Sequence, residues 1–265
     1  MKKVVIMGAS SGMGYALAEA LASRGVKVGI AARHTSSMRE LKDRYPLYVE
    51  YESIDITKRD AKAKLESLID KIGGMDIYFH SAGIGYENLS LDPEREVEII
   101  RSNAVGFARM LCSAYRYFRD NGRKGHIVAI TSVAGTKGIG RLSAYSSTKK
   151  FDQTYINALE QLSHEEGADI AFTDIRPGWV HTPLLPDDRK FPMEMSEEYV
   201  LPYILKAIVR KKRVQVIDWR WNALVGAWRL LPNCIWTRMK IRLSDPDTPL
   251  PVDLNLPASE DRRFD

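Results

Sequence analysis

The chain has 265 residues, of which 45% are hydrophobic and 28% charged, and its formal net charge is +5. These values are ordinary for a soluble globular protein. The positive excess is spread along the chain, so nucleic acid is not an expected partner. The two cysteines, Cys112 and Cys234, have neither metal-binding nor disulfide-framework spacing, which favours a reducing, cytoplasmic location. No apolar run is long enough to cross a membrane, and the histidines lack metal-ligand spacing, so no metal site is expected.

Short apolar runs alternate with helical patterns along the chain. The expected strands cover residues 4–7, 26–32, 48–54, 76–80, 126–131, 169–175 and 214–217. The expected helices cover residues 13–24, 36–44, 58–72, 93–119, 143–166 and 196–211, with Gly25 and Gly167 as C-terminal caps of the first and fifth. This alternation predicts an α/β fold, a doubly wound parallel sheet (Rossmann fold) of seven strands in the order 3-2-1-4-5-6-7. We expect a single domain over residues 1–243, with a C-terminal helical extension, and a proline-rich tail over 244–265.

The first expected strand runs directly into a glycine-rich turn, and a helix follows the turn. Glycines allow a tight turn and a close approach of the backbone to a phosphate. The N-terminus of the helix presents free N–H groups to an anion. The turn therefore predicts a dinucleotide-binding loop whose cofactor contacts are Gly8, Ser10, Ser11, Gly12, Met13 and Gly14.

The end of the second strand indicates which dinucleotide binds. NAD-selective sites hold an acidic residue near this point for the ribose 2′-hydroxyl, but no acid occurs from residue 26 to residue 38. Arg33 instead offers a guanidinium fork that suits a 2′-phosphate, which favours NADP(H) over NAD(H). After the third strand, Asp55 is expected at the adenine with Ile56 beside it, unless Asp55 caps the helix that follows.

Tyr145 and Lys149 are four residues apart in an expected helix and share one of its faces. A phenol has a reference pKa of about 10, and a nearby cation favours its ionised form. A tyrosine in this setting can exchange a proton with a carbonyl oxygen near neutral pH. The pair therefore predicts acid–base chemistry at a carbonyl or alcohol.

Together these motifs resemble the compact, single-domain branch of the short-chain dehydrogenase/reductase family, over about residues 3–185. The glycine motif matches, although the family usually has a threonine where this chain has Met7. The family's Asn-Ala-Gly after the fourth strand appears as Ser81-Ala82-Gly83, preceded by His80. The other matches are Asn103 in a helix, Ser132 thirteen residues before Tyr145, Pro177-Gly178 after the sixth strand, and Thr182.

The resemblance implies an NADP(H)-dependent oxidoreductase that interconverts a small-molecule carbonyl and a secondary alcohol by hydride transfer. Tyr145 would act as general acid/base, Ser132 would hold the substrate oxygen, Lys149 would contact the nicotinamide ribose, and Asn103 would hold a water that links Lys149 to solvent. It also implies a homodimer or homotetramer through the helices that contain Asn103 and Tyr145. Further implied cofactor contacts are Ser81, Ala82, Gly83, Tyr145, Lys149, Pro177, Gly178, Val180 and Thr182.

Two other functions fit the same scaffold. A non-catalytic, NADP-sensing regulatory protein would bind the dinucleotide without turnover, but a sensor needs no proton relay such as Asn103, Ser132, Tyr145 and Lys149. An epimerase or dehydratase would return the hydride to its substrate, but the C-terminal region is too short for a full sugar-nucleotide domain.

The loop 181–195 interrupts the alternation and carries Pro183, Pro186 and Pro192. A loop of this length in a compact domain is usually functional, so we expect a substrate lid over about residues 181–205. Phe191, Met193, Met195 and Tyr199 are its candidate apolar contacts, with the core face of a short helix as the alternative. His181 is either a substrate contact or an ordinary loop histidine.

The segment 219–242 interleaves tryptophans with basic residues. Its members are Trp219, Trp221, Trp228 and Trp236, with Arg220, Arg229, Arg238, Lys240 and Arg242. Such a segment can lie on a membrane surface as a peripheral contact, or line a subunit interface. The interpretation we favour is a helix packed on the domain with its arginines outward.

Overall fold

The computed structural model describes residues 2–185 and 190–241. The expected proline-rich tail over 244–265, and the loop and segment positions Pro186 and Arg242, lie outside these residues.

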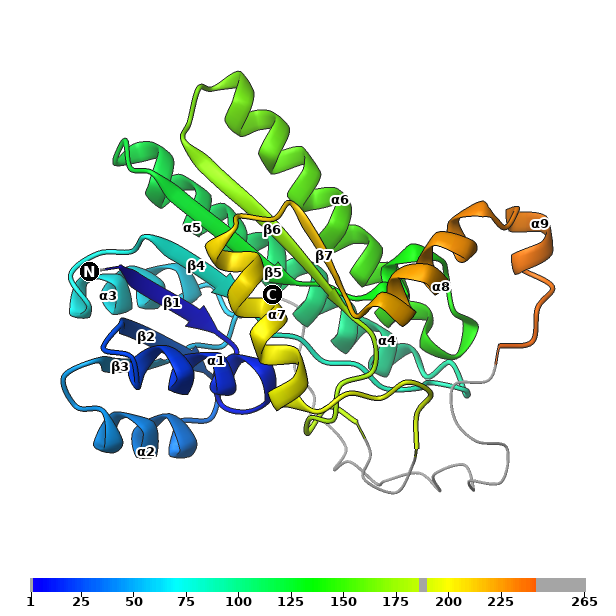
Figure 1. Cartoon of the computed structure of the whole chain (residues 1–265), viewed down its shortest axis with the longest axis horizontal. Helices are drawn as coiled ribbons and strands as arrows, with labels where there is room; N and C mark the ends of the chain where they lie inside the picture. Colours follow the sequence, from blue (N-terminus) through cyan, green and yellow to red (C-terminus); the bar gives the residue numbers. More distant parts are fainter. Residues whose placement is uncertain (1, 186–189, 242–265) are drawn as a thin grey trace.

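Seven parallel strands form one sheet, as the sequence predicted (Figure 1). The strands are β1 (Lys3–Met7), β2 (Lys27–Ala32), β3 (Val49–Ser53), β4 (Ile77–His80), β5 (Gly125–Ile130), β6 (Ile170–Pro177) and β7 (Val214–Ile217). Their order is β3-β2-β1-β4-β5-β6-β7, which confirms the predicted doubly wound topology. The carboxyl ends of these strands share one edge of the sheet, where ligands bind in open α/β folds.

Helices cover both faces of the sheet (Figure 1). One face carries α1 (Gly12–Ala22), α2 (Ser36–Arg44) and α7 (Glu197–Val209), and the other carries α3 (Ala61–Lys71), α5 (Phe107–Asp120) and α6 (Ser143–Glu165). Gly25 (φ +76°) and Gly167 (φ +66°) follow α1 and α6 in the left-handed region, as expected of C-terminal caps.

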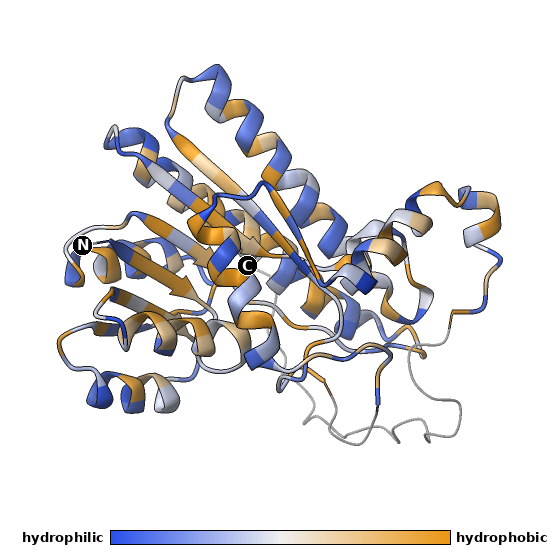
Figure 2. Cartoon of the chain, in the orientation of Figure 1, coloured by the Kyte–Doolittle hydropathy of each residue, from blue (hydrophilic) through white to orange (hydrophobic). Residues whose placement is uncertain are grey.

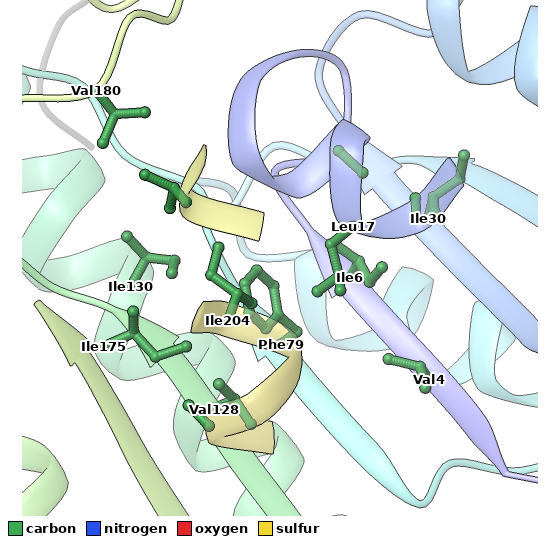
Figure 3. Close-up of a cluster of buried hydrophobic side chains, with 14 of the residues drawn as sticks. Val4, Ile6, Leu17, Ile30, Phe79, Val128, Ile130, Ile175, Val180 and Ile204 are labelled. Carbon is green, nitrogen blue, oxygen red and sulfur yellow. The ribbon is translucent and has the colours of Figure 1, made fainter. Parts of the chain in front are cut away.

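Apolar side chains from the strands and the inner faces of the helices form the core. Figure 2 shows the strands as the most hydrophobic elements, with hydrophilic residues on the outer faces of the helices. In the cluster of Figure 3, Ile6 and Ile30 from the sheet lie near Leu17 of α1, and Phe79 and Val128 lie near Ile204 of α7. This packing holds α1, and therefore the glycine-rich turn before it, against the centre of the sheet.

The single helix predicted over 93–119 is divided by a wider, π-helical turn. The structure has α4 (Pro93–Ile100), the π turn η1 (Arg101–Gly106) and then α5. Single π turns inside α-helices are frequent at functional sites, and this one contains Asn103. Two short 3₁₀ segments, η2 (Val133–Thr136) and η3 (Gly140–Leu142), connect β5 to α6.

A C-terminal extension follows the last strand and lies beside the carboxyl edge of the sheet (Figure 1). It consists of α8 (Trp219–Leu230) and α9 (Asn233–Trp236). Across the two described ranges, none of the helices is both long and apolar enough to span a membrane.

The predicted oligomer interface stays a prediction. The helices assigned to it carry exposed apolar side chains, among them Ile100, Val105 and Phe151, which a second subunit would cover.

Candidate active site

Three of the predicted catalytic side chains line one cavity of about 470 Å³ at the carboxyl edge of the sheet. Ser132 follows β5, and Tyr145 and Lys149 extend from the first turns of α6. The Ser132 hydroxyl accepts a hydrogen bond from the Ala134 N–H (3.1 Å) and donates to the Pro177 carbonyl oxygen (3.4 Å). These contacts fix the serine at the end of its strand, beside the loop that follows β6.

The ring of Tyr145 lies against the backbone of Gly85. A Cβ atom at position 85 would lie 2.4 Å from Cδ2 of the tyrosine, so only glycine leaves room for the ring there. The ammonium of Lys149 lies 5.8 Å from the centre of the same ring. The structure therefore brings the phenol and the ammonium together, as the i, i+4 spacing predicted.

Lys149 is buried and paired with an acid that the sequence analysis missed. Its Nζ lies 3.0 Å from Oδ2 of Asp152, and both side chains are nearly inaccessible, at 7% and 0% exposed. Burial alone would lower the pKa of Lys149, but the charges of Asp152 and Tyr145 outweigh burial and raise it. Burial raises the pKa of Asp152 to about 6, against the opposing effect of Lys149. The sequence could have indicated this pair, because Asp152 follows Lys149 by three residues in the same expected helix.

Asn103 does not line the cavity but holds the loop that does. Its side-chain oxygen accepts from the Ile84 N–H (2.9 Å), and its Nδ2 donates to the Ile84 carbonyl (2.7 Å) and to the Thr148 hydroxyl (3.3 Å). This clamp fixes the segment between Gly83 and Gly85, where the backbone passes Lys149 and Tyr145. The expected water held by Asn103 stays a prediction.

The predicted cofactor residues gather around two cavities that meet at Gly83. The cavity that holds the catalytic side chains is also lined by Met13, Ser81, Gly83, Pro177, Gly178, Val180 and Thr182. A smaller one, of about 120 Å³, is lined by Gly8, Ser10, Arg33, Asp55, Ile56, Ala82 and Gly83. Ser11, Gly12 and Gly14 line neither and form the turn and the start of α1. The small cavity also involves His34 and Ser102, which the sequence analysis did not assign.

The glycine-rich turn fits a dinucleotide phosphate. Gly8 has φ +88°, and a Cβ atom at Gly14 would lie 2.1 Å from the Gly8 carbonyl oxygen, so the turn is as tight as only glycines permit. Ser11 caps α1 without a side-chain hydrogen bond, and the first turn of α1 contains no acid. The first N–H groups of the helix are therefore available to an anion.

Arg33 and Asp55 lie at the small cavity, where an adenine-ribose end would bind. Arg33 is exposed at the end of β2. Oδ1 of Asp55 accepts from the N–H (2.9 Å) and the hydroxyl (2.7 Å) of Thr57. The alternative that Asp55 caps the next helix is wrong, because α3 begins at Ala61 and Asp60 occupies its capping position. The expected adenine contact stays a prediction.

The four expected lid residues separate into different environments. Phe191 lines the large cavity, and Pro192, Leu184 and Leu185 line it as well.

Met195 instead belongs to the main core, where Val180 and Met195 form an isolated bridge, and Met193 packs at the edge of that core. Tyr199 is partly exposed and bonds with Tyr203 and Asp218. Met195 and Tyr199 therefore do not line the cavity, because backbone pairing draws the first inward and α7 carries the second outward. The substrate lid itself stays a prediction.

His181 lies outside the cavity lining. It is 65% exposed, and its Nδ1 lies 2.9 Å from a carboxylate oxygen of Glu194. The alternative of an ordinary loop histidine is the one that this placement supports.

The tryptophan segment packs mainly on the domain. Trp221 and Trp236 are buried, and both line the large cavity. Trp228 also lines the cavity and packs against the main core and against the small cluster that contains Trp236. Arg229, Arg238 and Lys240 are exposed, in agreement with the packed-helix interpretation. Trp219 differs, since 76% of its surface is exposed. The membrane and subunit-interface alternatives stay predictions.

His80, which directly precedes the Ser81-Ala82-Gly83 motif, is a fully buried histidine. Its Nδ1 lies 2.9 Å from the Tyr78 hydroxyl, and its ring packs edge-on against Phe107. Burial, helped by the charge of Lys149, lowers the pKa of His80 to about 3. His80 is therefore neutral in the folded protein, whereas the unfolded chain binds a proton there below pH 6.5.

The His80→Gln variant is expected to weaken the acid sensitivity of folding. His80 stabilises the folded protein fully above pH 6.5, and this contribution is lost as the pH falls toward 3. The loss amounts to about 1.4 kcal/mol per pH unit for one proton. Urea denaturation between pH 4 and pH 6.5 measures how steeply the free energy of unfolding changes with pH in the variant and in the wild type. The raised pKa of Asp152 changes this slope in the opposite direction, but equally in both proteins. His164→Gln, at an exposed position on α6, is the control, and equal slopes for all three proteins would contradict the assignment.

Comparisons with known proteins agree with this geometry. A family model described as short chain dehydrogenase matches residues 2–192. The chain belongs to the short-chain dehydrogenase family. As a member of this family it is an oxidoreductase, and the fold and family predicted from its motifs are confirmed.

Individual relatives extend over most of this short-chain dehydrogenase. A protein from Myxococcus xanthus, described as an uncharacterized oxidoreductase, is 30% identical over 250 residues, which cover 91% of this chain and 97% of the relative. Another uncharacterized oxidoreductase, from Listeria monocytogenes, is 32% identical over 191 residues, or 69% of this chain and 76% of the relative. A short-chain dehydrogenase from Sphingobium yanoikuyae, solved in complex with NADPH, superposes with a TM-score of 0.72 at 24% identity and covers 91% of this chain and 97% of its own.

Proposed function

We propose that this short-chain dehydrogenase is an NADP(H)-dependent oxidoreductase that interconverts a carbonyl and a secondary alcohol. The observation that carries the proposal is the convergence of Ser132, Tyr145 and Lys149 on one cavity with Pro177 and Thr182. A hydroxyl fixed at a strand end, a phenol and a buried ammonium are the groups that hold a carbonyl oxygen and exchange a proton with it.

Each side chain has one task in this proposal. Ser132, still held by the Ala134 N–H, turns its one hydroxyl proton from the Pro177 carbonyl to the substrate oxygen. Tyr145 gives its phenolic proton to that oxygen during reduction and takes it back during oxidation. Lys149 places a positive charge beside the phenol. A bound nicotinamide dinucleotide supplies or accepts the hydride, and Gly8, Ser10, Met13, Ser81, Gly83 and Thr182 would hold it.

The Arg33→Ala variant is expected to lose the proposed preference for NADPH. Arg33 lies at the small cavity, and no acid occurs from residue 26 to residue 38 to bind a ribose 2′-hydroxyl. Loss of one guanidinium–phosphate contact, about 1.5–3 kcal/mol, corresponds to roughly 10- to 100-fold weaker NADPH binding. Titration of the protein with NADPH and NADH by fluorescence measures both constants. Arg39→Ala, on the exposed face of α2, is the control; equal NADPH and NADH affinities in the wild type would contradict the preference.

The function itself is tested by following NADPH and NADH absorbance with a panel of ketones, aldehydes and diketones. We expect carbonyl-dependent consumption of NADPH that is abolished in Ser132→Ala. Tight binding of NADPH without turnover of any carbonyl or alcohol would instead favour the NADP-sensing regulator.

A further inference from the structure

The large cavity has an aromatic wall, defined here as Trp179, Phe191, Trp221, Trp228 and Trp236. The rings of Trp179 and Phe191 pack with their centres 4.5 Å apart, and those of Trp228 and Trp236 meet edge to face at 5.4 Å. Ile139 and Leu142 lie in the same small cluster as Trp236, and Trp228 packs against this cluster. Four of the five wall rings are therefore packed in two pairs.

The polar atoms of two indoles in this wall are already hydrogen bonded. Nε1 of Trp221 donates to the Met193 carbonyl (3.3 Å), and Nε1 of Trp236 donates to the Gly138 carbonyl (2.6 Å). These bonds hold the indoles in place and leave their carbon surfaces to contact a ligand. Aromatic carbon surfaces prefer other rings, in offset-stacked or edge-to-face contact.

The charged residues in the lining are engaged with other protein groups. Glu87 lies 3.5 Å from the guanidinium of Arg141. Arg95 lies over the ring of Tyr86, whose hydroxyl donates to Glu98 (2.8 Å). A charged group on a substrate would have to compete with these contacts in a largely apolar space. The hydroxyls of Ser132 and Tyr145 remain as the pair placed for one carbonyl oxygen.

The wall is built largely from the C-terminal extension. The family model ends at residue 192, whereas Trp221, Trp228 and Trp236 follow it. The extension has no acidic residue between Trp219 and Ile241, and three of its tryptophans contact the cavity. Three of the five wall residues therefore lie beyond the segment that the family model matches, whereas most of the other lining residues lie within it.

We propose that the substrate is a neutral, bulky ketone whose carbonyl is flanked by apolar, ring-containing groups, and that Trp228 and Trp236 select it. This inference rests on the proposed function of the same site. A cavity of about 470 Å³ has room for such a molecule beside a nicotinamide ring. The substrate presents its single oxygen to Ser132 and Tyr145 and packs its rings against the aromatic wall.

Three ketones of matched chemistry test the proposal: benzophenone, its carboxylated form 4-benzoylbenzoate, and 2-butanone. With NADPH, kcat/KM for benzophenone is expected to exceed that for 2-butanone by roughly 10²-fold because of the apolar area buried. The carboxylate is expected to lower kcat/KM by at least about tenfold, because it must be desolvated in the cavity. A higher kcat/KM for 2-butanone or for 4-benzoylbenzoate than for benzophenone would overturn the proposal.

Variants of the wall assign the selectivity to named side chains. Trp236→Ala, and Trp228→Phe as a milder change if the first fails to fold, are expected to raise KM for benzophenone by about tenfold or less with little change for 2-butanone. Trp219→Ala is the matched control, since Trp219 is exposed on the same extension and does not line the cavity. Equal effects on both ketones, or an effect of Trp219→Ala as large as that of Trp236→Ala, would contradict the assignment.

A binding measurement separates this proposal from the proposed function. Quenching of tryptophan fluorescence reports benzophenone binding to the NADP⁺ complex without turnover. Saturable quenching that is weakened in Trp228→Phe supports the ketone site even if no turnover is found, in which case only the proposed reaction fails. Turnover of small ketones without any benzophenone binding overturns the substrate proposal and leaves the reaction intact.

Discussion

Replacing Tyr145 with phenylalanine is expected to lower kcat for carbonyl reduction by about 10³-fold, the usual contribution of a positioned acid–base group. The change removes only the hydroxyl, and the ring remains packed against Gly85. The substitution leaves the proposed cofactor contacts at the glycine-rich turn and the loop after β6 unchanged, so the Kd for NADPH should change by no more than about threefold, as expected for a loss confined to the transition state. Single-turnover kinetics and fluorescence titration measure the two quantities separately.

The same substitution at Tyr155 is the matched control. Tyr155 lies on α6 as well, but its hydroxyl contacts Sγ of Cys112 (2.7 Å) and it does not line the cavity. Tyr155→Phe should therefore leave kcat unchanged. If Tyr145→Phe kept more than about a tenth of the wild-type kcat, another group would have to supply the proton, since general acid–base catalysis contributes about 10²–10⁴-fold.

Replacing Asp174 with alanine is expected to lower the free energy of unfolding by about 3–5 kcal/mol, the cost of leaving a buried charge without its partner. Asp174 is fully buried on β6. It accepts from the Thr131 hydroxyl (2.6 Å) and pairs with Nε and Nη2 of Arg176 at 2.7 and 2.6 Å. Without the carboxylate, the buried guanidinium of Arg176 has lost both of these contacts. Urea denaturation followed by circular dichroism measures the loss.

Asp169→Ala tests whether burial, and not merely charge pairing, causes this loss. Asp169 precedes β6 and pairs with Lys124 at 3.0 Å, but both side chains are exposed. An exposed pair contributes at most about 1 kcal/mol. Similar losses in the two variants would show that the buried network around Asp174 is not a special source of stability.

The sheet was predictable because its strands are short, buried and bounded by clear signals. Runs such as Val4–Met7 and Ile127–Ile130 are apolar without interruption, as expected of parallel strands covered on both faces. The π turn at Arg101–Gly106 was not predictable, because its residues continue the helical pattern and only the contacts of Asn103 with Ile84 reveal its role. β6 runs two residues beyond its predicted end because Arg176 and Pro177 pair with β7.

The convergence of Ser132, Tyr145 and Lys149 on one cavity was predictable from spacing along one helix and one strand end. The cavity wall was not, because it depends on how distant segments pack. Trp236 meets Ile139 and Leu142 across about a hundred residues of sequence, and no local pattern indicates that contact. Met195 and Phe191 are four residues apart and equally apolar, yet the first enters the core and the second faces the cavity. Asp152 pairs with Lys149 within one helix, but its burial depends on how α6 packs against the rest of the fold.

The contact between Gly178 and Trp221 joins the loop that follows β6 to the C-terminal extension, so the extension is not an independent unit. A Cβ atom at Gly178 would lie 2.0 Å from Cε2 of Trp221, so the indole rests directly on the backbone of the loop that follows β6. A chimera whose new segment after residue 192 lacked this indole would leave a gap beside the loop. New specificity is therefore better sought by substitutions within the extension, at Trp228 and Trp236, with Trp221 retained.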